Sequence, residues 1–316
     1  MNRQTLETPV LFIIFKREQE ALETLKAIAK VRPKKLYIAA DGPRTGVANE
    51  DHMVMATREA VLAAVDWECE VKTNFQVSNL GCGPGVLAAI NWFFREEESG
   101  IILEDDCVAL PSFFHFCETL LQRYANDDRV GLISGFNNIP YDMGPYSYCF
   151  SKYTVCWGWA TWRRAWKHMD YEMGWLQDPW KENVLLNAGY NGKDRTYWER
   201  RVEAVHKNTV SAWDYQWCFT IAAQNQLGIF PAKNLISNIG IGEGATHTTK
   251  SPLVSYSAGE DLDFPLNHPK AMAPNMGFDK TFYKSRNNLV NTLAWFFPKP
   301  VKDFVKSAIA VVYNKQ

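Results

Sequence analysis

The stretch Gly100-Ile-Ile-Leu-Glu-Asp-Asp106 decides the fold: a short apolar run ends in three consecutive acidic side chains. The run is typical of a buried parallel strand, and open α/β sheets bind their ligands at the carboxyl ends of such strands. Three adjacent carboxylates are costly there unless positive charge lies among them. A divalent cation, Mg²⁺ or Mn²⁺, held by one or two carboxylates and by substrate phosphates, would supply that charge. The alternative is that Asp105 or Asp106 caps a short helix before Pro111.

Strands and helices alternate along the chain before this stretch. Apolar or alternating patterns predict strands at 9–15, 35–40 and 70–77, and helical spacing predicts helices at 19–29 and 49–65 and around 88–93. The order βαβαβαβ predicts a doubly wound α/β sheet with parallel strands. Asp41 follows the second strand, so we expect it at the same edge of the sheet as the acidic triplet.

Beyond Pro111 the sequence becomes aromatic and less regular. Its pattern predicts helices at 113–124 and 214–225, strands at 130–134 and 228–231, an irregular middle at 141–180 and a loop rich in Gly and Thr at 238–249. We expect one catalytic domain over residues 1–286, with a donor half at about 1–135 and an acceptor half at about 136–286, followed by a tail at 287–316.

The composition argues against several classes of protein. A net charge of −1 over 316 residues argues against nucleic acid as a partner, so a polyanionic ligand needs a metal ion or a few placed Lys and Arg. Seven cysteines, an odd number without a CxxC pair, argue against a disulfide framework or a zinc site and favour a reducing cytoplasm. No apolar stretch of about 18 residues occurs, so no membrane span is expected. Aromatic residues make up 14%, which fits either a well-filled core or sugar recognition.

A family resemblance begins at the acidic triplet. The segment Glu104-Asp-Asp-Cys-Val-Ala-Leu-Pro-Ser-Phe-Phe114 resembles the EDD-x(4)-P-x-FF segment of the N-acetylglucosaminyltransferase I family of inverting GT-A glycosyltransferases. Four blocks, at Asn79, Gly100, Trp157 and Ser237, look like those of bacterial nucleotide-diphosphosugar transferases: NLGCGPG, GIILEDDC, WGWATWRRAW and SNIGIGEGATHT. EDD alone is a weak signal, but the ordered set over residues 9 to 250 is specific.

This resemblance implies a GT-A fold and an activity. It implies metal-dependent, inverting transfer from a nucleotide-diphospho-sugar to a hydroxyl of a glycan or lipid-linked acceptor, as in polysaccharide biosynthesis. A UDP-linked donor is expected, with UDP-GlcNAc as one candidate, and Mn²⁺ or Mg²⁺ as the cofactor.

The resemblance also implies roles for the acidic residues. Asp106 is the expected metal ligand, Asp105 would contact the ribose or the donor sugar, and Glu104 would orient its neighbours. Asp41 is expected to read the nucleobase, and the alternative is a turn aspartate before Gly42.

Four further residues complete the expected site. Asp214 is the candidate general base, with a helix N-cap as the alternative. Trp159 is expected to line the donor pocket, although several tryptophans at this spacing must belong to the core, and Arg17 is expected to contact the donor. His247 is expected to close over the donor or ligate the metal, with a surface histidine as the alternative.

Other readings of the same residues stay open. A glycoside hydrolase would use Asp214 and one acid of the triplet as its carboxylate pair, but consecutive acids suit a metal better. A non-catalytic sugar-binding protein on the same scaffold is the third reading, and the presence of both Asp106 and Asp214 argues against it.

The tail from 291 to 316 interleaves apolar residues with lysines. This pattern predicts either an amphipathic helix on a membrane surface, which suits lipid-linked acceptors, or a segment that packs against the domain or a dimer partner. We therefore expect a cytoplasmic protein that, in the first case, is peripheral on the inner face of the membrane. The oligomeric state is left open.

Overall fold

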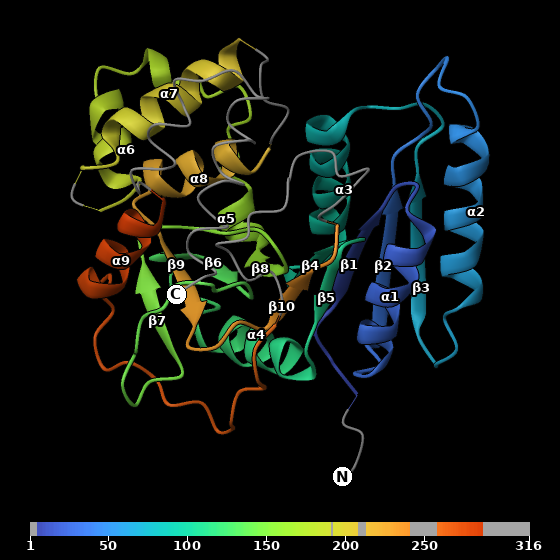
Figure 1. Cartoon of the computed structure of the whole chain (residues 1–316), viewed down its shortest axis with the longest axis horizontal. Coiled ribbons are helices and arrows are strands. Elements are labelled where there is room, and N and C mark those ends of the chain that lie inside the picture. Colours follow the sequence, from blue (N-terminus) through green and yellow to red (C-terminus); the bar gives the residue numbers. More distant parts are fainter. Residues whose placement is uncertain (1–4, 191, 208–212, 241–257, 287–316) are drawn as a thin grey trace, which may run out of the picture.

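The computed structural model describes residues 5–190, 192–207, 213–240 and 258–286, and an eight-stranded sheet forms its centre (Figure 1). The strand order is β3-β2-β1-β4-β8-β6-β9-β7. Four of its seven strand pairings are parallel and three are antiparallel. The predicted α/β class with a large, mostly parallel central sheet is therefore confirmed.

The first part of the chain folds as its apolar pattern predicts. Its elements are β1 (Val10–Ile14), α1 (Glu18–Ala29), β2 (Lys35–Ala40), α2 (Glu50–Ala63), β3 (Glu70–Phe75), α3 (Cys82–Glu96) and β4 (Ser99–Glu104). Because β1 pairs in parallel with both β2 and β4, the carboxyl ends of these three strands meet at one edge. The one departure is that α3 begins at Cys82, so Gly83 and Gly85 lie in its first turn rather than in a preceding loop.

The second part of the chain completes the sheet. It contains β5 (Cys107–Ala109), α4 (Pro111–Arg123), β6 (Val130–Ser134), β7 (Tyr148–Ser151), β8 (Trp159–Trp162), α5 (Arg163–Trp166), the 3-10 turn η1 (Gly174–Gln177), α6 (Lys181–Asn187), α7 (Arg195–His206), α8 (Asp214–Ala223), β9 (Leu227–Pro231), β10 (Ile236–Asn238) and α9 (Met276–Arg286). The stretch 141–180, for which the sequence predicts irregular structure, supplies β7 and β8. Strand β8 lies antiparallel between β4 and β6, where Ala160 pairs with both Ile101 and Ile133.

Apolar side chains cover both faces of the sheet. Successive side chains of a strand point to opposite faces, so Val10, Phe12 and Ile14 of β1 pack with α1 and α4, whereas Leu11 packs with α3, α5 and α8. A third apolar cluster joins α6, α7, α8 and α9 to β7 and β9. Figure 1 shows α6 and α7 at the opposite end of the molecule from α2.

A two-stranded ribbon of β5 and β10 lies directly after the acidic triplet. The two strands are antiparallel, and Asn238 pairs with Cys107. This pairing brings residues 238–240 beside Asp106, although they are far apart in the sequence. Within the described residues, no helix has the length and apolar character needed to cross a bilayer.

Candidate functional site

A cavity of about 580 Å³ opens at the edge where β1, β2 and β4 end. Its volume is within the range of small-ligand sites. Three strand ends, the first turns of α3 and the end of β10 form its wall, which includes Lys16, Arg17, Asp41, Arg44, Asn79, Cys82, Gly85, Glu104, Asp105, Asp106, Trp157, Asn238 and Gly240. Five of the predicted site residues, Arg17, Asp41 and the acidic triplet, are therefore together in one cavity.

Arg17 supplies the positive charge that the acidic triplet requires. Its guanidinium donates to both carboxylate oxygens of Asp105, and its Nη2 lies 2.8 Å from Asp106 Oδ2. Burial lowers the pKa of Arg17, but the two carboxylates outweigh that effect and raise it overall. In this structure, positive charge for the triplet, the requirement that suggests a metal ion, is thus met in part by the side chain just before α1.

Asp106 retains an oxygen that suits a divalent cation. Its Oδ2 accepts from Arg17, whereas its Oδ1 is contacted by the Cys107 thiol at 3.5 Å, a weak donor. Within the described residues, no three His, Cys, Asp or Glu side chains are grouped to hold a metal ion. Proteins commonly hold Mg²⁺ through one or two carboxylates and ligand phosphates. The residues present therefore fit an ion shared with a phosphorylated ligand, and do not fit an ion enclosed by protein alone.

Glu104 and Asp214 influence each other electrostatically. Burial, followed by the charges of Asp106, Asp105 and Asp214, raises the pKa of Glu104 well above its usual range. Asp214, at the start of α8, thus lies within electrostatic range of the triplet.

The carboxylate of Asp41 is fully engaged by the backbone and by Asn79. Its Oδ1 accepts from the amides of Gly42 and Leu80, both at 2.8 Å. Its Oδ2 accepts from Asn79 Nδ2 at 2.9 Å and from the Gly81 amide at 3.0 Å. Four bonds use the acceptor capacity of a carboxylate. These contacts favour the turn-aspartate alternative, and the nucleobase role of Asp41 stays a prediction.

Two cations outside the predicted site, Lys16 and Arg44, also line the cavity. The buried carboxylate of Glu50, at the start of α2, holds both of them: Lys16 Nζ lies 2.6 Å and Arg44 Nε 2.9 Å from its two oxygens. The hydrogen bonds from Arg44 come first among the causes that lower the pKa of Glu50. Lys16 and Arg44 come soon after the ends of β1 (Ile14) and β2 (Ala40), and that position in the sequence was the available signal.

Trp159 is not at the cavity, which corrects its prediction as a donor contact. It is fully buried and packs against Trp166, Trp213 and Trp217 in the layer that contains α3 and α8. Trp157, two residues earlier, lines the cavity instead. The reason is that β8 begins at Trp159, so this side chain is fixed on a covered face of the sheet.

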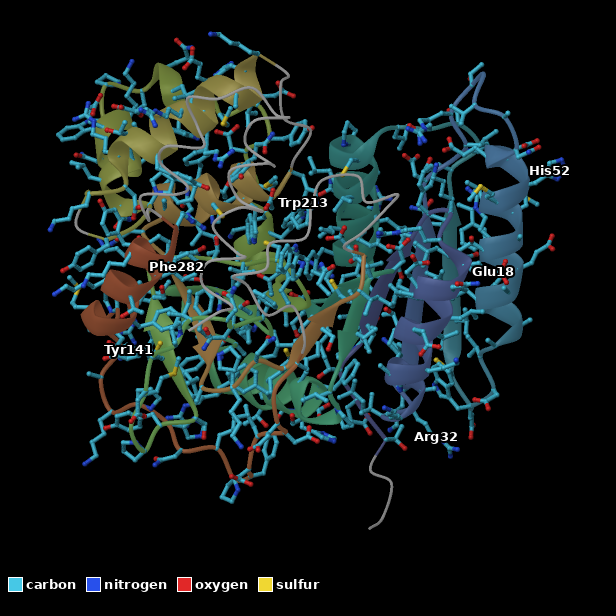
Figure 2. The ribbon with its side chains drawn as sticks, viewed as in Figure 1. Glu18, Arg32, His52, Tyr141, Trp213 and Phe282 are labelled. Atoms are coloured by element: carbon cyan, nitrogen blue, oxygen red, sulfur yellow. The ribbon has the colours of Figure 1, made fainter. Side chains whose placement is uncertain are left out.

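Trp213, which precedes Asp214, is 4% exposed and lies in the middle of the molecule (Figure 2). His247 and the tail at 287–316 lie outside the described residues, so their predicted roles stay predictions.

The ribbon closes one side of the cavity tightly. The amide of Ile239 donates to the carbonyl of Asp106 at 2.9 Å. A Cβ atom at Gly240 would lie 2.1 Å from Asp106 Oδ2 and 2.5 Å from Arg17 Nη1. Such distances are far inside van der Waals contact, so only glycine fits at position 240 while Asp106 and Arg17 keep these positions.

No protein-family model and no curated protein matches the chain. Among solved structures, the inositol-1-phosphate CTP transferase of T. maritima matches at 11% identity and a TM-score of 0.33, over 54% of this chain and 77% of that one. The glycosyltransferase GlyE of Streptococcus pneumoniae matches at 10% identity and a TM-score of 0.34, over 71% of this chain and less than half, 45%, of that one. Mouse xyloside xylosyltransferase 1 matches at 11% identity and a TM-score of 0.34, over 70% and 83%. Because each TM-score is below 0.5, the proposed function rests on the cavity itself.

Proposed function

We propose that the chain is a glycosyltransferase of the GT-A type that transfers a sugar from a UDP-linked donor to a hydroxyl of a glycan or lipid-linked acceptor. One observation carries the proposal: three cations, Lys16, Arg17 and Arg44, share a cavity with Asp106, and Asp214 lies within electrostatic range of that cavity. The cations suit a diphosphate, and a carboxylate nearby suits a hydroxyl that must lose its proton.

The chain's own residues bind and orient the donor. Glu50 fixes Lys16 and Arg44 at the ends of their strands, where both can contact phosphate oxygens. Asp105, held by Arg17, would contact the ribose or the donor sugar. Asp106 would hold a Mn²⁺ or Mg²⁺ ion, which offsets the charge that develops on the departing diphosphate.

Asp214 is the proposed general base. The acceptor oxygen bonds to the anomeric carbon from the face opposite the diphosphate, and its proton passes to the carboxylate of Asp214. The bond from that carbon to the diphosphate oxygen breaks, and its electron pair leaves on the nucleoside diphosphate. The configuration of the anomeric carbon is therefore inverted. Proton removal by a placed carboxylate contributes about 10²- to 10⁴-fold to such a rate.

Titration calorimetry and product analysis on the full chain test the proposal. UDP and a panel of UDP-sugars are titrated with Mn²⁺ and with EDTA, and released UDP is measured with saccharide acceptors present. Asp106→Asn should abolish the gain in UDP affinity that Mn²⁺ provides, and Asp214→Asn should lower kcat by about 10²-fold or more while UDP still binds. Asp128→Asn, a change at a carboxylate that is 88% exposed, is the matched control.

Three results would contradict the proposal. The first is an absence of UDP binding with and without Mn²⁺, and the second is a kcat for Asp214→Asn equal to that of the control. The third is release of free sugar from a glycan in EDTA without any nucleotide, which would indicate a glycoside hydrolase.

A further inference from the structure

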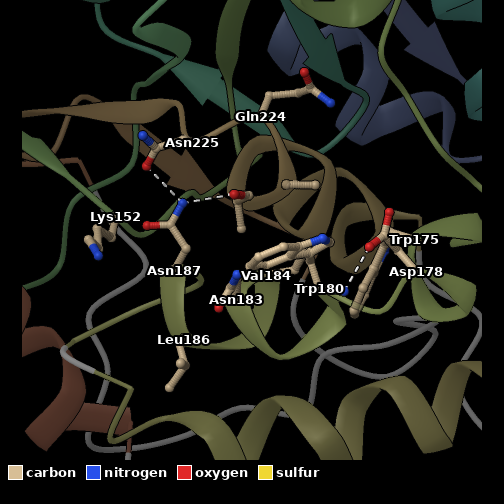
Figure 3. Close-up of a pocket in the computed structure, with 12 residues that line it drawn as sticks. Lys152, Trp175, Asp178, Trp180, Asn183, Val184, Leu186, Asn187, Gln224 and Asn225 are labelled. Carbon is tan, nitrogen blue, oxygen red and sulfur yellow. Dashed lines mark hydrogen bonds between the residues drawn. The ribbon is translucent and has the colours of Figure 1, made fainter.

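A second cavity, of about 590 Å³, lies between α6 and the end of α8 (Figure 3). Its lining residues come from η1, α6, the end of α8 and the loop after β7: Lys152, Trp175, Asp178, Trp180, Asn183, Val184, Leu186, Asn187 and 222–225. Asp214 is at the opposite end of α8, which makes the two ends roughly 12–17 Å apart along the helix axis. The two cavities share no lining residue, so the second is separate from the first.

Carboxamides dominate the polar lining of the second cavity. They belong to Asn183, Asn187, Gln224 and Asn225. Asn187 Nδ2 donates to Asn225 Oδ1 at 3.0 Å and to the carbonyl of Ala222 at 2.8 Å, so these two side chains are fixed across the gap between the helices (Figure 3). Carboxamides both donate and accept, as sugar hydroxyls do.

The charged groups of the lining balance. Lys152 and Asp178 are the cation and the anion among the lining residues, and Asp178 Oδ1 already accepts from the amide of Trp180 at 2.7 Å. A phosphorylated ligand or a nucleic acid would require an excess of Lys and Arg, which these lining residues do not provide. The second cavity therefore suits a neutral ligand that forms many hydrogen bonds.

An indole ring provides the apolar surface that such a ligand needs. Trp180, just before α6, is 71% exposed, an unusual state for so large an apolar side chain. Trp175, which packs against Phe219 at a centroid distance of 5.3 Å, forms part of the same wall. A pyranose ring has an apolar face of C–H groups and a rim of hydroxyls, which an exposed indole beside carboxamides matches.

We propose that the second cavity binds a neutral saccharide through stacking on Trp180 and hydrogen bonds to the carboxamides of α6 and α8. Its assignment to the acceptor or product glycan rests on the proposed transferase function, but saccharide binding itself does not.

Saccharide titrations of the full chain test this proposal. The probes are chitotriose in its N-acetylated form, cellotriose and maltotriose, with a sulfated oligosaccharide as the charged comparison, and binding is followed by calorimetry and by NMR. At least one neutral probe should bind, and Trp180→Ala should weaken it by tenfold or more. Trp180→Phe, which keeps an aromatic face, should lose less affinity than Trp180→Ala. Val77→Ala removes apolar surface from a side chain that is 94% exposed elsewhere, and should have no effect.

The results separate this proposal from the transferase proposal. Absence of binding by every neutral probe, preference for the sulfated probe, or equal affinity in Trp180→Ala would overturn the saccharide site. UDP titrations of the same Trp180 variants report on the first cavity alone. Absence of UDP binding by the wild-type chain, together with saccharide binding, would refute the transferase function and leave the saccharide site standing.

Discussion

Arg17 bridges Asp105 and Asp106, so the loss in the free energy of unfolding when Arg17 is replaced can be calculated. Replacing Arg17 by Gln leaves Asp105, which is 4% exposed, as a buried carboxylate without its cation. Breaking a buried ion pair in this way costs about 3–5 kcal/mol. Because the Arg17 side chain is 27% exposed and water reaches it, we expect the lower end, about 3 kcal/mol. In a chain of 316 residues, this cost corresponds to a fall in Tm of roughly 4 °C.

A double-mutant cycle measures whether the cost comes from the charge of Asp105. The free energy of unfolding is obtained from urea titrations of the wild type, Arg17→Gln, Asp105→Asn and the double variant. In the double variant, Asp105→Asn removes the carboxylate charge that Arg17→Gln leaves unpaired. The double variant should therefore be about 2 kcal/mol more stable than the sum of the two single changes predicts. Arg129→Gln is the matched control, since Arg129 pairs with Asp127 on the surface and should cost less than about 1 kcal/mol. An Arg17→Gln variant as stable as this control, or strict additivity in the cycle, would refute the reasoning.

Three further changes have defined outcomes. Asp41→Ala removes an acceptor of four hydrogen bonds, so thermal melts should show that the free energy of unfolding falls by about 2–3 kcal/mol, and UDP should bind more weakly. Unchanged stability, with a changed preference among UDP, GDP and CDP, would instead assign Asp41 to recognition of the base. Gly158→Ala should lower stability to urea by about 1–2 kcal/mol, because Gly158 has φ +61° and its Cβ would lie 2.4 Å from Ile236; wild-type stability would contradict this. Burial raises the pKa of Asp279 to about 6, so this group destabilises the fold as pH rises from about 4 to 6. The free energy of unfolding of Asp279→Asn should therefore rise by roughly 2–3 kcal/mol relative to that of the wild type as the pH increases from about 4 to 7. The same dependence of this free energy on pH in both proteins would exclude the assignment.

The elements up to β4 were predictable because each carries its own signal. The spacing of apolar residues within each segment indicates whether it forms a strand or a helix. Parallel strands joined by helices can then be arranged in only a few ways. The position of Asp41 and of the triplet at one edge follows from that geometry. The edge of the sheet that holds the first cavity is therefore predictable from the sequence.

The remaining features depend on pairing between distant segments. Strand β8 is four residues long, Trp159–Trp162, and is stabilised as a strand by β4 and β6 on either side. A short aromatic run has no period that shows which tryptophan faces the core, so Trp157 and Trp159 could not be distinguished. The bond from Arg17 to the triplet likewise joins residues that lie far apart in the chain.

The insertion of β8 between β4 and β6 has a consequence for engineering the two predicted halves. A fragment that ends near residue 135 would leave one side of β4 without hydrogen-bond partners, because the strand that satisfies it comes from beyond that boundary. The donor half therefore cannot be grafted onto a different acceptor half by cutting at that point. The cut would leave an unpaired edge strand in each fragment, and such strands can pair with other chains and aggregate. Chimeras of this protein should instead exchange whole surface loops and leave the interleaved strands intact.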